Sequence, residues 1–205
     1  GGGTFGPQQV ITTNVDEAMD VYATDLDGDG DADVLSASIG NATGGKIAWY
    51  ENQGGGNFSP QQVITTSVDN ANSVFAADLD GDGDADVLSA AAGFDDEIAW
   101  YENQGNGSFG GQQVITTNVD FVTDVFATDL DGDGDADVLS ASVNDEKIAW
   151  YENLGGGNFG PQDTLTANFG GAVSGTRSVF ATDLNGDGDA DVLSASVSGI
   201  AWYEN

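Results

Sequence analysis

Four nearly identical acidic segments contain most of the side chains in this sequence that could do chemistry. The first reads DLDGDGDAD from Asp25 to Asp33, with carboxylates at positions 1, 3, 5 and 9, glycine at position 6, and a backbone carbonyl free at position 7. A hard cation such as Ca²⁺ prefers about six to eight oxygen ligands, and a tight loop with glycine at its sharp turn can wrap them around the ion. The spacing predicts one cation site per loop, ligated by Asp25, Asp27, Asp29, Asp33, Asp78, Asp80, Asp82, Asp86, Asp129, Asp131, Asp133, Asp137, Asp183, Asn185, Asp187 and Asp191.

Two alternative interpretations of these segments are weaker. A solvated acidic turn would explain one copy, because Asp and Gly are common in turns, but it does not explain four copies in register. An EF-hand shares the first six positions, yet it needs flanking helices and a bidentate Glu at position 12. Position 12 is serine in every copy, at Ser36, Ser89, Ser140 and Ser194. In the fourth loop Asn185 keeps an oxygen but removes one charge, so weaker binding is expected there.

The residue types present leave little room for catalysis. The chain contains no His and no Cys, which excludes His-based triads, thiol nucleophiles and the usual zinc sites. A glycosidase would need two carboxylates in different environments. The candidate carboxylates end four equivalent WYEN segments, at Glu51, Glu102, Glu152 and Glu204. We therefore expect that the protein is not an enzyme.

The strong negative charge of the chain argues against two classes of binding partner. Only Lys46, Lys147 and Arg177 are basic, against 35 Asp and Glu, so the formal net charge is -32. Nucleic acids and anionic membrane surfaces both require a positively charged footprint, so neither is an expected partner. No apolar run approaches the length of a membrane span, and membrane insertion is not expected.

The whole chain is a fourfold repeat. The segment IAWYEN begins at Ile47, Ile98, Ile148 and Ile200, and the acidic loops recur at the same period of 50–54 residues. A fixed period of this kind is the signature of a repeat architecture. We divide the chain, as a single repeat domain, into units 1–52, 53–103, 104–153 and 154–205.

Each unit is predicted to form four short strands and no helix. In the first unit they are QQVITT, VYATD, DVLSAS and IAWYEN, separated by clusters of Gly, Asn and Asp. The last three are apolar on both faces, so each sheet must be covered on both sides, and stacked neighbouring units can do this. The pattern predicts an all-β, β-propeller-type array of four four-stranded blades with a cation loop in each. The tryptophans are expected between blades, at Trp49, Trp100, Trp150 and Trp202.

The order of strands within a blade leaves one strand without a partner. If VYATD is innermost, the order is VYATD, DVLSAS, IAWYEN and then QQVITT at the outer edge. The first QQVITT, residues 8–13, precedes the first complete blade. It either completes the last blade or pairs with another chain, because exposed edge strands tend to find partners.

The D-x-D-G-D-G-x-x-D loop between two strands, with NFG or SFG before the outer strand, resembles the FG-GAP/VCBS repeat family. These are the calcium-binding blades of integrin α-subunit propellers, of fungal and bacterial lectins and of many large secreted bacterial proteins. The resemblance covers essentially the whole chain and implies a β-propeller with four Ca²⁺ sites. It implies backbone-carbonyl ligands at position 7, which is Asp31, Asp84, Asp135 and Asp189. Propellers of this family usually have about seven blades, whereas this chain has four.

The segments that differ between the units indicate where a ligand would bind. The acidic loops and the NQGGGNF-type linkers are expected at one end of the blades, and the variable loops at the other. The most distinctive residues of the variable end are Met19, Phe94, Phe121 and Arg177. We expect a calcium-stabilised adhesion module, lectin-like or protein-binding, from a larger secreted or surface protein. The alternative is a structural repeat that self-assembles through unpaired edge strands into a multi-chain ring or filament.

Overall fold

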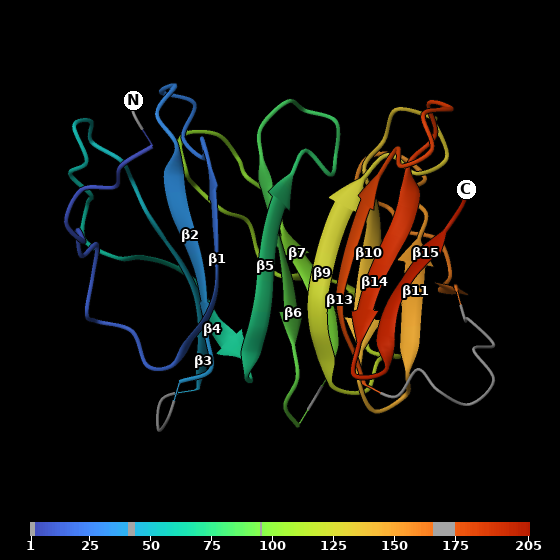
Figure 1. Cartoon of the computed structure of the whole chain (residues 1–205). Helices are drawn as coiled ribbons and strands as arrows, with labels where there is room; N and C mark the ends of the chain where they lie inside the picture. Colours follow the sequence, from blue (N-terminus) through green and yellow to red (C-terminus); the bar gives the residue numbers. More distant parts are fainter. Residues whose placement is uncertain (1–2, 41–43, 95, 166–174) are drawn as a thin grey trace.

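The computed structural model describes residues 3–40, 44–94, 96–165 and 175–205, and over these residues the chain forms strands and turns but no helix. The strands lie in four antiparallel sheets (Figure 1). The first sheet contains β1 (Ala18–Thr24), β2 (Asp33–Ser38), β3 (Gly45–Tyr50) and β4 (Gln62–Val68), and the second β5 (Ala71–Ala77), β6 (Asp86–Ala91), β7 (Glu97–Tyr101) and β8 (Gln113–Thr116). The third contains β9 (Val122–Thr128), β10 (Asp137–Ser142), β11 (Lys147–Tyr151) and β12 (Asp163–Thr164), and the fourth β13 (Thr176–Thr182), β14 (Asp191–Ser196) and β15 (Gly199–Tyr203).

The order of strands within each sheet is the one predicted from the sequence. The first sheet runs β1-β2-β3-β4, and the second and third sheets repeat this order. Pairing of Thr24 with Asp33 and of Val34 with Tyr50 places the acidic loop and the following linker at one end of the first sheet. The described parts of the variable loops lie at the other end, as the antiparallel connections require, and residues 41–43, 95 and 166–174 lie outside the described residues.

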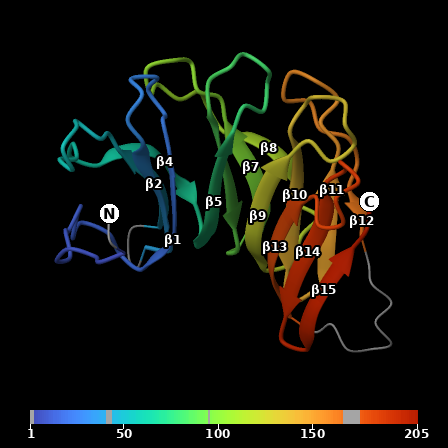
Figure 2. The same ribbon diagram turned by 45° about the horizontal axis from the view of Figure 1, so that its top comes forward.

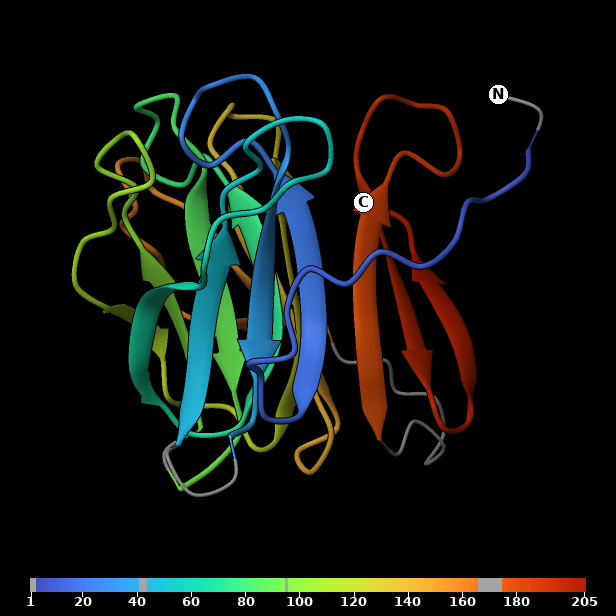
Figure 3. The same ribbon diagram turned by 90° about the vertical axis from the view of Figure 1, so that its left-hand side faces the viewer.

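The first QQVITT segment is the exception to this pattern. Residues 8–13 form no strand and leave the fourth sheet with β13, β14 and β15 among the described residues. Figure 3 shows the segment that leads into β1 running outside the sheets. Residues 8–12 instead line a shallow hollow with Val21, Val34 and Tyr50 of the first sheet. The predicted pairing of this segment stays a prediction.

The sheets stand side by side in chain order, and the apolar core lies between them (Figures 1 and 2). Three clusters of buried side chains fill the three junctions. In the first junction Ile47 and Trp49 of one sheet face Val87 and Tyr101 of the next. The alternation predicted for IAWYEN explains this, since Ile and Trp point to one neighbour and Ala and Tyr to the other. Trp49 and Trp100 are buried, whereas Trp202 on the fourth sheet is 46% exposed.

A buried asparagine at the end of the second and third WYEN segments, Asn103 and Asn153, joins consecutive sheets. Asn103 Nδ2 donates to the carbonyl oxygen of Ala85 in its own acidic loop at 3.0 Å and to that of Leu26 in the preceding loop at 2.8 Å. Asn153 bonds Leu79 and Ala136 in the same way. The backbone N–H of Asn103 donates to Asp86 at 2.7 Å, so the loop, the linker and the neighbouring sheet share one network.

Replacing this asparagine is expected to destabilise the protein at two sheets together. Asn103→Ala removes the donor to two carbonyls at a site that is 1% exposed, and groups left unpaired in such a place cost about 1–3 kcal/mol each. Asn52→Ala is the matched control, since Asn52 Nδ2 bonds Ala32 of its own loop and is partly exposed. Urea denaturation should show a loss of roughly 2–4 kcal/mol for Asn103→Ala and a clearly smaller loss for Asn52→Ala. Equal losses would contradict the inter-sheet role.

Alternating Asp and Ser residues connect the first strands of the four sheets. The Asp20 carboxylate accepts hydrogen bonds from Ser73 Oγ at 3.0 Å and from the Val74 backbone N–H at 3.0 Å. Asp124 accepts from Ser178 Oγ at 2.7 Å and Val179 N–H at 2.9 Å, and also from Ser73 Oγ at 3.1 Å. A hydroxyl has one proton, so Ser73 divides it between two carboxylates.

The burial of Asp124 gives this carboxyl a testable pH dependence. Burial raises the pKa of Asp124, and hydrogen bonds from Ser178, Val179 and Ser73 offset part of the rise. A carboxyl whose pKa is higher in the folded state favours folding more as the pH falls through that pKa, and favours it least at neutral pH and above. In Asp124→Asn the amide can donate to Ser73 Oγ, which frees the Ser73 proton for Asp20. Thermal melts should show the variant gaining a few degrees over the wild type at pH 8, with the gain shrinking at pH 5. An equal loss at both pH values would contradict this.

Candidate metal centre

The carboxylate at position 1 of each acidic loop organises the turn. Asp25 Oδ1 accepts the N–H of Gly28 at 2.8 Å and Oδ2 accepts that of Gly30 at 2.9 Å. These glycines have φ angles of 80° and 94°, which residues with a Cβ rarely adopt. The equivalent aspartates of the other loops make the same pair of bonds, and these are Asp78, Asp129 and Asp183. The sequence therefore builds the same loop conformation four times.

The carboxylate at position 9 is buried beneath the loop. Asp86 is fully buried, and its two oxygens accept the backbone N–H groups of Leu79 at 2.9 Å and Asn103 at 2.7 Å. Burial raises the pKa of Asp86 to about 6, against the opposing effect of these two hydrogen bonds. Asp33, Asp137 and Asp191 make equivalent bonds. Position 9 is therefore a structural acceptor as well as a candidate ligand, a role that the loop spacing alone did not reveal.

The candidate ligands converge in three of the loops. Each of three groups brings ligand oxygens within 4.8 Å of one another and could hold a metal ion, and these are Asp25, Asp27 and Asp29; Asp78, Asp80 and Asp86; and Asp129, Asp131 and Asp137. Asp33, Asp82 and Asp133 belong to these three loops but fall outside the groups, and the side chains of the fourth loop form no such group among the described residues. In the fourth loop Asn185 Nδ2 donates to Asp187 Oδ2 at 2.9 Å, a contact that an aspartate could not make.

Burial, together with crowding of carboxylates, raises the cost of ionisation in these loops. Burial, followed by repulsion from neighbouring acids, raises the pKa of Asp80, although a hydrogen bond from the Asp82 backbone opposes it. The pKa of Asp27 is raised for the same reasons. The donor set consists entirely of oxygen, which suits a hard divalent cation, and a cation would favour the ionised form of every carboxylate. The residues therefore fit the ion that their spacing predicts.

The four residues predicted for ligand binding lie at the opposite end and divide into two pairs. Phe94 and Phe121 line one open hollow of about 430 Å³, together with Asp69 and Asn70. Met19 and Arg177 do not line it. Met19 lies near the start of β1 and Arg177 near the start of β13, each at the point where the pairing register with the next strand shifts.

Phe121 is held in a strained backbone conformation. Its φ angle is 59°, in the left-handed region where a bulky residue is an outlier. Its N–H donates to Asp96 at 2.9 Å, and its carbonyl accepts from Val143 N–H at 3.0 Å. The equivalent residues are Glu17, Asn70 and Gly175. Strain of this kind persists only where the surrounding structure holds the residue in place, and it tends to occur at functional sites.

Comparison with known families decides the classification. The model of the FG-GAP-like repeat matches residues 25–89, 78–140 and 129–194, which together span well over half of the chain. The chain belongs to the FG-GAP-like repeat family. Each matched segment begins at position 1 of one acidic loop and ends in the strand after the next loop, so the family match and the loop geometry describe the same repeat. The family membership expected from the sequence is thereby confirmed.

One solved structure supports the fold. A chain of the Photorhabdus luminescens Tc holotoxin pore matches 89% of this chain with a TM-score of 0.52 and 19% sequence identity. The matched region is 9% of that chain, so this protein spans less than a tenth of its length. The comparison with curated proteins gave no match. The described residues contain no helical segment with the length and apolarity that a bilayer span requires.

Proposed function

We propose that this FG-GAP-like repeat protein is a calcium-stabilised recognition module that binds a carbohydrate or protein ligand at the hollow beside Phe94 and Phe121. The observation that carries the proposal is the pairing of these two exposed aromatic side chains. Phe94 is 98% exposed, and Phe121 is 47% exposed on a strained backbone. Ligand sites typically combine aromatic walls with a few polar groups, and Asp69 and Asn70 supply the latter.

Calcium is the proposed ion in all four loops, and its role is structural. When bound, it neutralises the carboxylates and crosslinks the two strands that each loop joins. The loop residues hold the carboxylates through backbone N–H groups, and the buried position-9 aspartate anchors the linker of the same sheet. The formal charge of -32 adds repulsion that opposes folding without the ion. The four sheets are proposed to act as β-propeller blades.

An extracellular or cell-surface location follows from the same proposal. Extracellular calcium modules work at affinities near millimolar, a concentration that the outside of cells supplies. Adhesion and lectin-like binding suit a rigid repeat scaffold whose loops vary at one end. Strong negative charge argues against nucleic acid as the ligand. The likeness to part of a holotoxin pore chain also fits a module that works within a larger protein.

A glycan array and a protein-binding screen in calcium buffer test the proposal directly. Phe94→Ala and Phe121→Gly should each weaken binding of the ligand found by at least tenfold, whereas Phe121→Gly should raise the melting temperature because it relieves backbone strain. Glu17→Gly is the matched control, since Glu17 has a φ angle of 53° and does not line the hollow. It should raise stability and leave binding unchanged. Unaltered binding by both phenylalanine variants would overturn the proposed site.

A further inference from the structure

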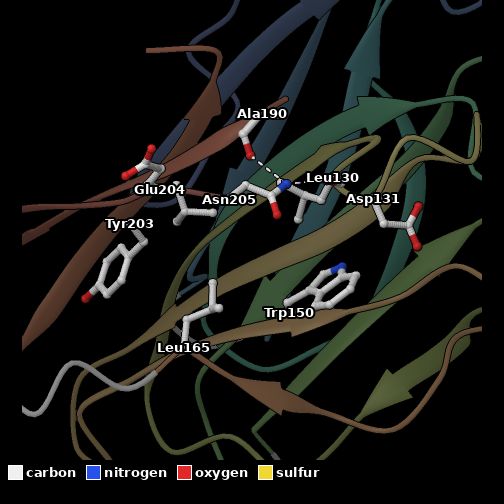
Figure 4. Close-up of a pocket in the computed structure, with 9 residues that line it drawn as sticks. Leu130, Asp131, Trp150, Leu165, Ala190, Tyr203, Glu204 and Asn205 are labelled. Carbon is white, nitrogen blue, oxygen red and sulfur yellow. Dashed lines mark hydrogen bonds between the residues drawn. The ribbon is translucent and has the colours of Figure 1, made fainter. Parts of the chain in front are cut away.

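An apolar cavity of about 130 Å³ opens between the third and fourth sheets (Figure 4). Its apolar walls come mainly from Leu130, Trp150, Leu165, Ala190 and Tyr203, and Asp131 and Glu204 also line it. Asn205 closes one side, with its Nδ2 donating to the carbonyl oxygens of Leu130 and Ala190. A cavity of roughly 150 Å³ with apolar walls accepts benzene in another protein, so this one has the size of an aromatic ring.

The equivalent places in the other two junctions are filled by phenylalanines from the linkers. Phe109 packs edge-on against Trp49, with ring centroids 6.4 Å apart and planes at 72°. Phe159 packs in the cluster that contains Trp100. The linker backbone also packs directly against these rings. A Cβ added at Gly107 would lie 2.3 Å from the Trp49 ring, and one added at Gly157 would lie 2.3 Å from the Trp100 ring. Trp150 holds the same repeat position as these two tryptophans.

The phenylalanine that matches this cavity in the repeat is Phe5. The sequence GGGTFGPQQVITT at residues 1–13 repeats the linker and outer strand found as GGGNFSPQQVITT at 54–66. The Phe5 side chain is fully exposed, and residues 8–13 form no strand. The fourth sheet offers the matching free edge, since β15 pairs with β14 alone among the described strands.

The first and fourth sheets each have one face that no other sheet of the chain covers, and these two faces carry the residues that pack together in the junctions between consecutive sheets. Leu184 is 48% exposed, whereas its equivalent Leu26 is 2% exposed because its loop adjoins the second sheet. The ring series Tyr22, Phe75, Phe126 and Phe180 has centroid spacings of 4.5, 4.8 and 4.9 Å and ends at Phe180, which is 49% exposed.

The hydrogen bonds at the first sheet fit the same pattern. Inside the chain, Val125 N–H donates to Ser73 Oγ of the preceding sheet at 3.4 Å. The equivalent Val21 N–H donates to the carboxylate of its own neighbour Asp20 at 2.8 Å. If the first sheet of another copy packed on the fourth sheet, its Val21 would lie beside Ser178, just as Val125 lies beside Ser73. The Asp–Ser alternation would then continue from one copy to the next.

We propose that a second copy of this chain docks head to tail on the fourth sheet, inserting its Phe5 into this cavity and adding residues 8–13 as a strand beside β15. The first sheet of that copy then covers Phe180 and Leu184. A second copy is favoured over closure within one chain because the first and fourth sheets lie at opposite ends of the array (Figures 1 and 2). The interface is heterologous, so successive copies form a ring or a filament.

Cysteine crosslinking identifies the occupant, because the chain has no native cysteine. A Phe5→Cys chain mixed with a Leu165→Cys chain in calcium buffer should oxidise to a mixed covalent dimer. A Phe94→Cys chain, with its cysteine at the other end of the sheets, should not crosslink to Leu165→Cys. The double variant carrying Phe5→Cys and Leu165→Cys should give a ladder of multimers. An internally crosslinked monomer from the double variant would overturn the proposal in favour of closure within one chain.

Sedimentation measurements on the full chain supply the second readout. The wild type should associate with rising concentration, and Phe5→Ala should weaken that association at least tenfold without lowering the melting temperature of the dissociated chain. Phe94→Ala removes an equally exposed ring and should leave association unchanged. The synthetic peptide GGGTFGPQQVITT should compete with association, and the same peptide with Ala at position 5 should not. A wild type that stays monomeric at all concentrations would overturn the proposal.

Discussion

Chelation of calcium with EDTA is expected to lower the melting temperature of this protein by tens of degrees. An ion present at about 100 times its dissociation constant stabilises the folded state by about 2.7 kcal/mol per site. For a protein of this size each kcal/mol shifts the melting temperature by roughly 2–4 °C. Four sites on one array therefore give an expected shift of about 20–40 °C.

Differential scanning calorimetry in calcium and in EDTA measures this shift. Sodium chloride at high concentration is the control, because salt screens repulsion between exposed carboxylates without coordinating them. It should recover only a small part of the loss. Magnesium should also rescue poorly, since it demands a smaller octahedral site and keeps its waters. A melting temperature that does not change in EDTA would contradict a structural role for the ion.

Removal of a position-9 carboxylate is expected to destabilise the protein with and without calcium. Asp86→Ala leaves the buried N–H groups of Leu79 and Asn103 without their acceptor. Unpaired buried donors cost about 1–3 kcal/mol each, so the free energy of unfolding should fall by roughly 2–6 kcal/mol. The loss should persist in EDTA because these two hydrogen bonds do not involve the ion.

The matched control is position 3 of the same loop. Asp80 is less buried than Asp86, and its pKa is raised by burial and, to a smaller extent, by repulsion from Asp82 and Asp78. Asp80→Asn should lower stability in calcium and leave it unchanged or slightly higher in EDTA. Urea denaturation of both variants in the two buffers separates the roles. If Asp86→Ala loses stability only in calcium, position 9 serves the ion alone and the structural role is wrong.

Much of the fold could be predicted because the same sequence pattern occurs in all four repeats. The alternation in IAWYEN indicated which side chains face each neighbouring sheet, and Ile47, Trp49 and Tyr101 lie as that alternation requires. The acidic loops could be located from aspartate and glycine spacing alone, since the positive φ angles at Gly28 and Gly30 leave few other residues possible.

Other features depend on contacts between repeats, which a periodic sequence does not display. Asn103 follows Glu102 in a segment that looked like a strand end, and only the stacking of sheets brings its amide to Leu26. The Asp–Ser alternation likewise has a role only because the first strands of consecutive sheets are neighbours. Residues 8–13 are the opposite case. Their sequence pattern predicts a strand, but they form none, and no strand of the described chain pairs with them.

Counting the calcium ions bound by the full chain tests the central claim most directly. Native mass spectrometry of protein titrated with calcium should show four ions per chain at saturation. The fourth ion should bind more weakly than the other three, since Asn185 replaces an aspartate in the last loop. Asp183→Ala should then reduce the count to three. A chain that takes up no calcium at millimolar concentration would contradict the account.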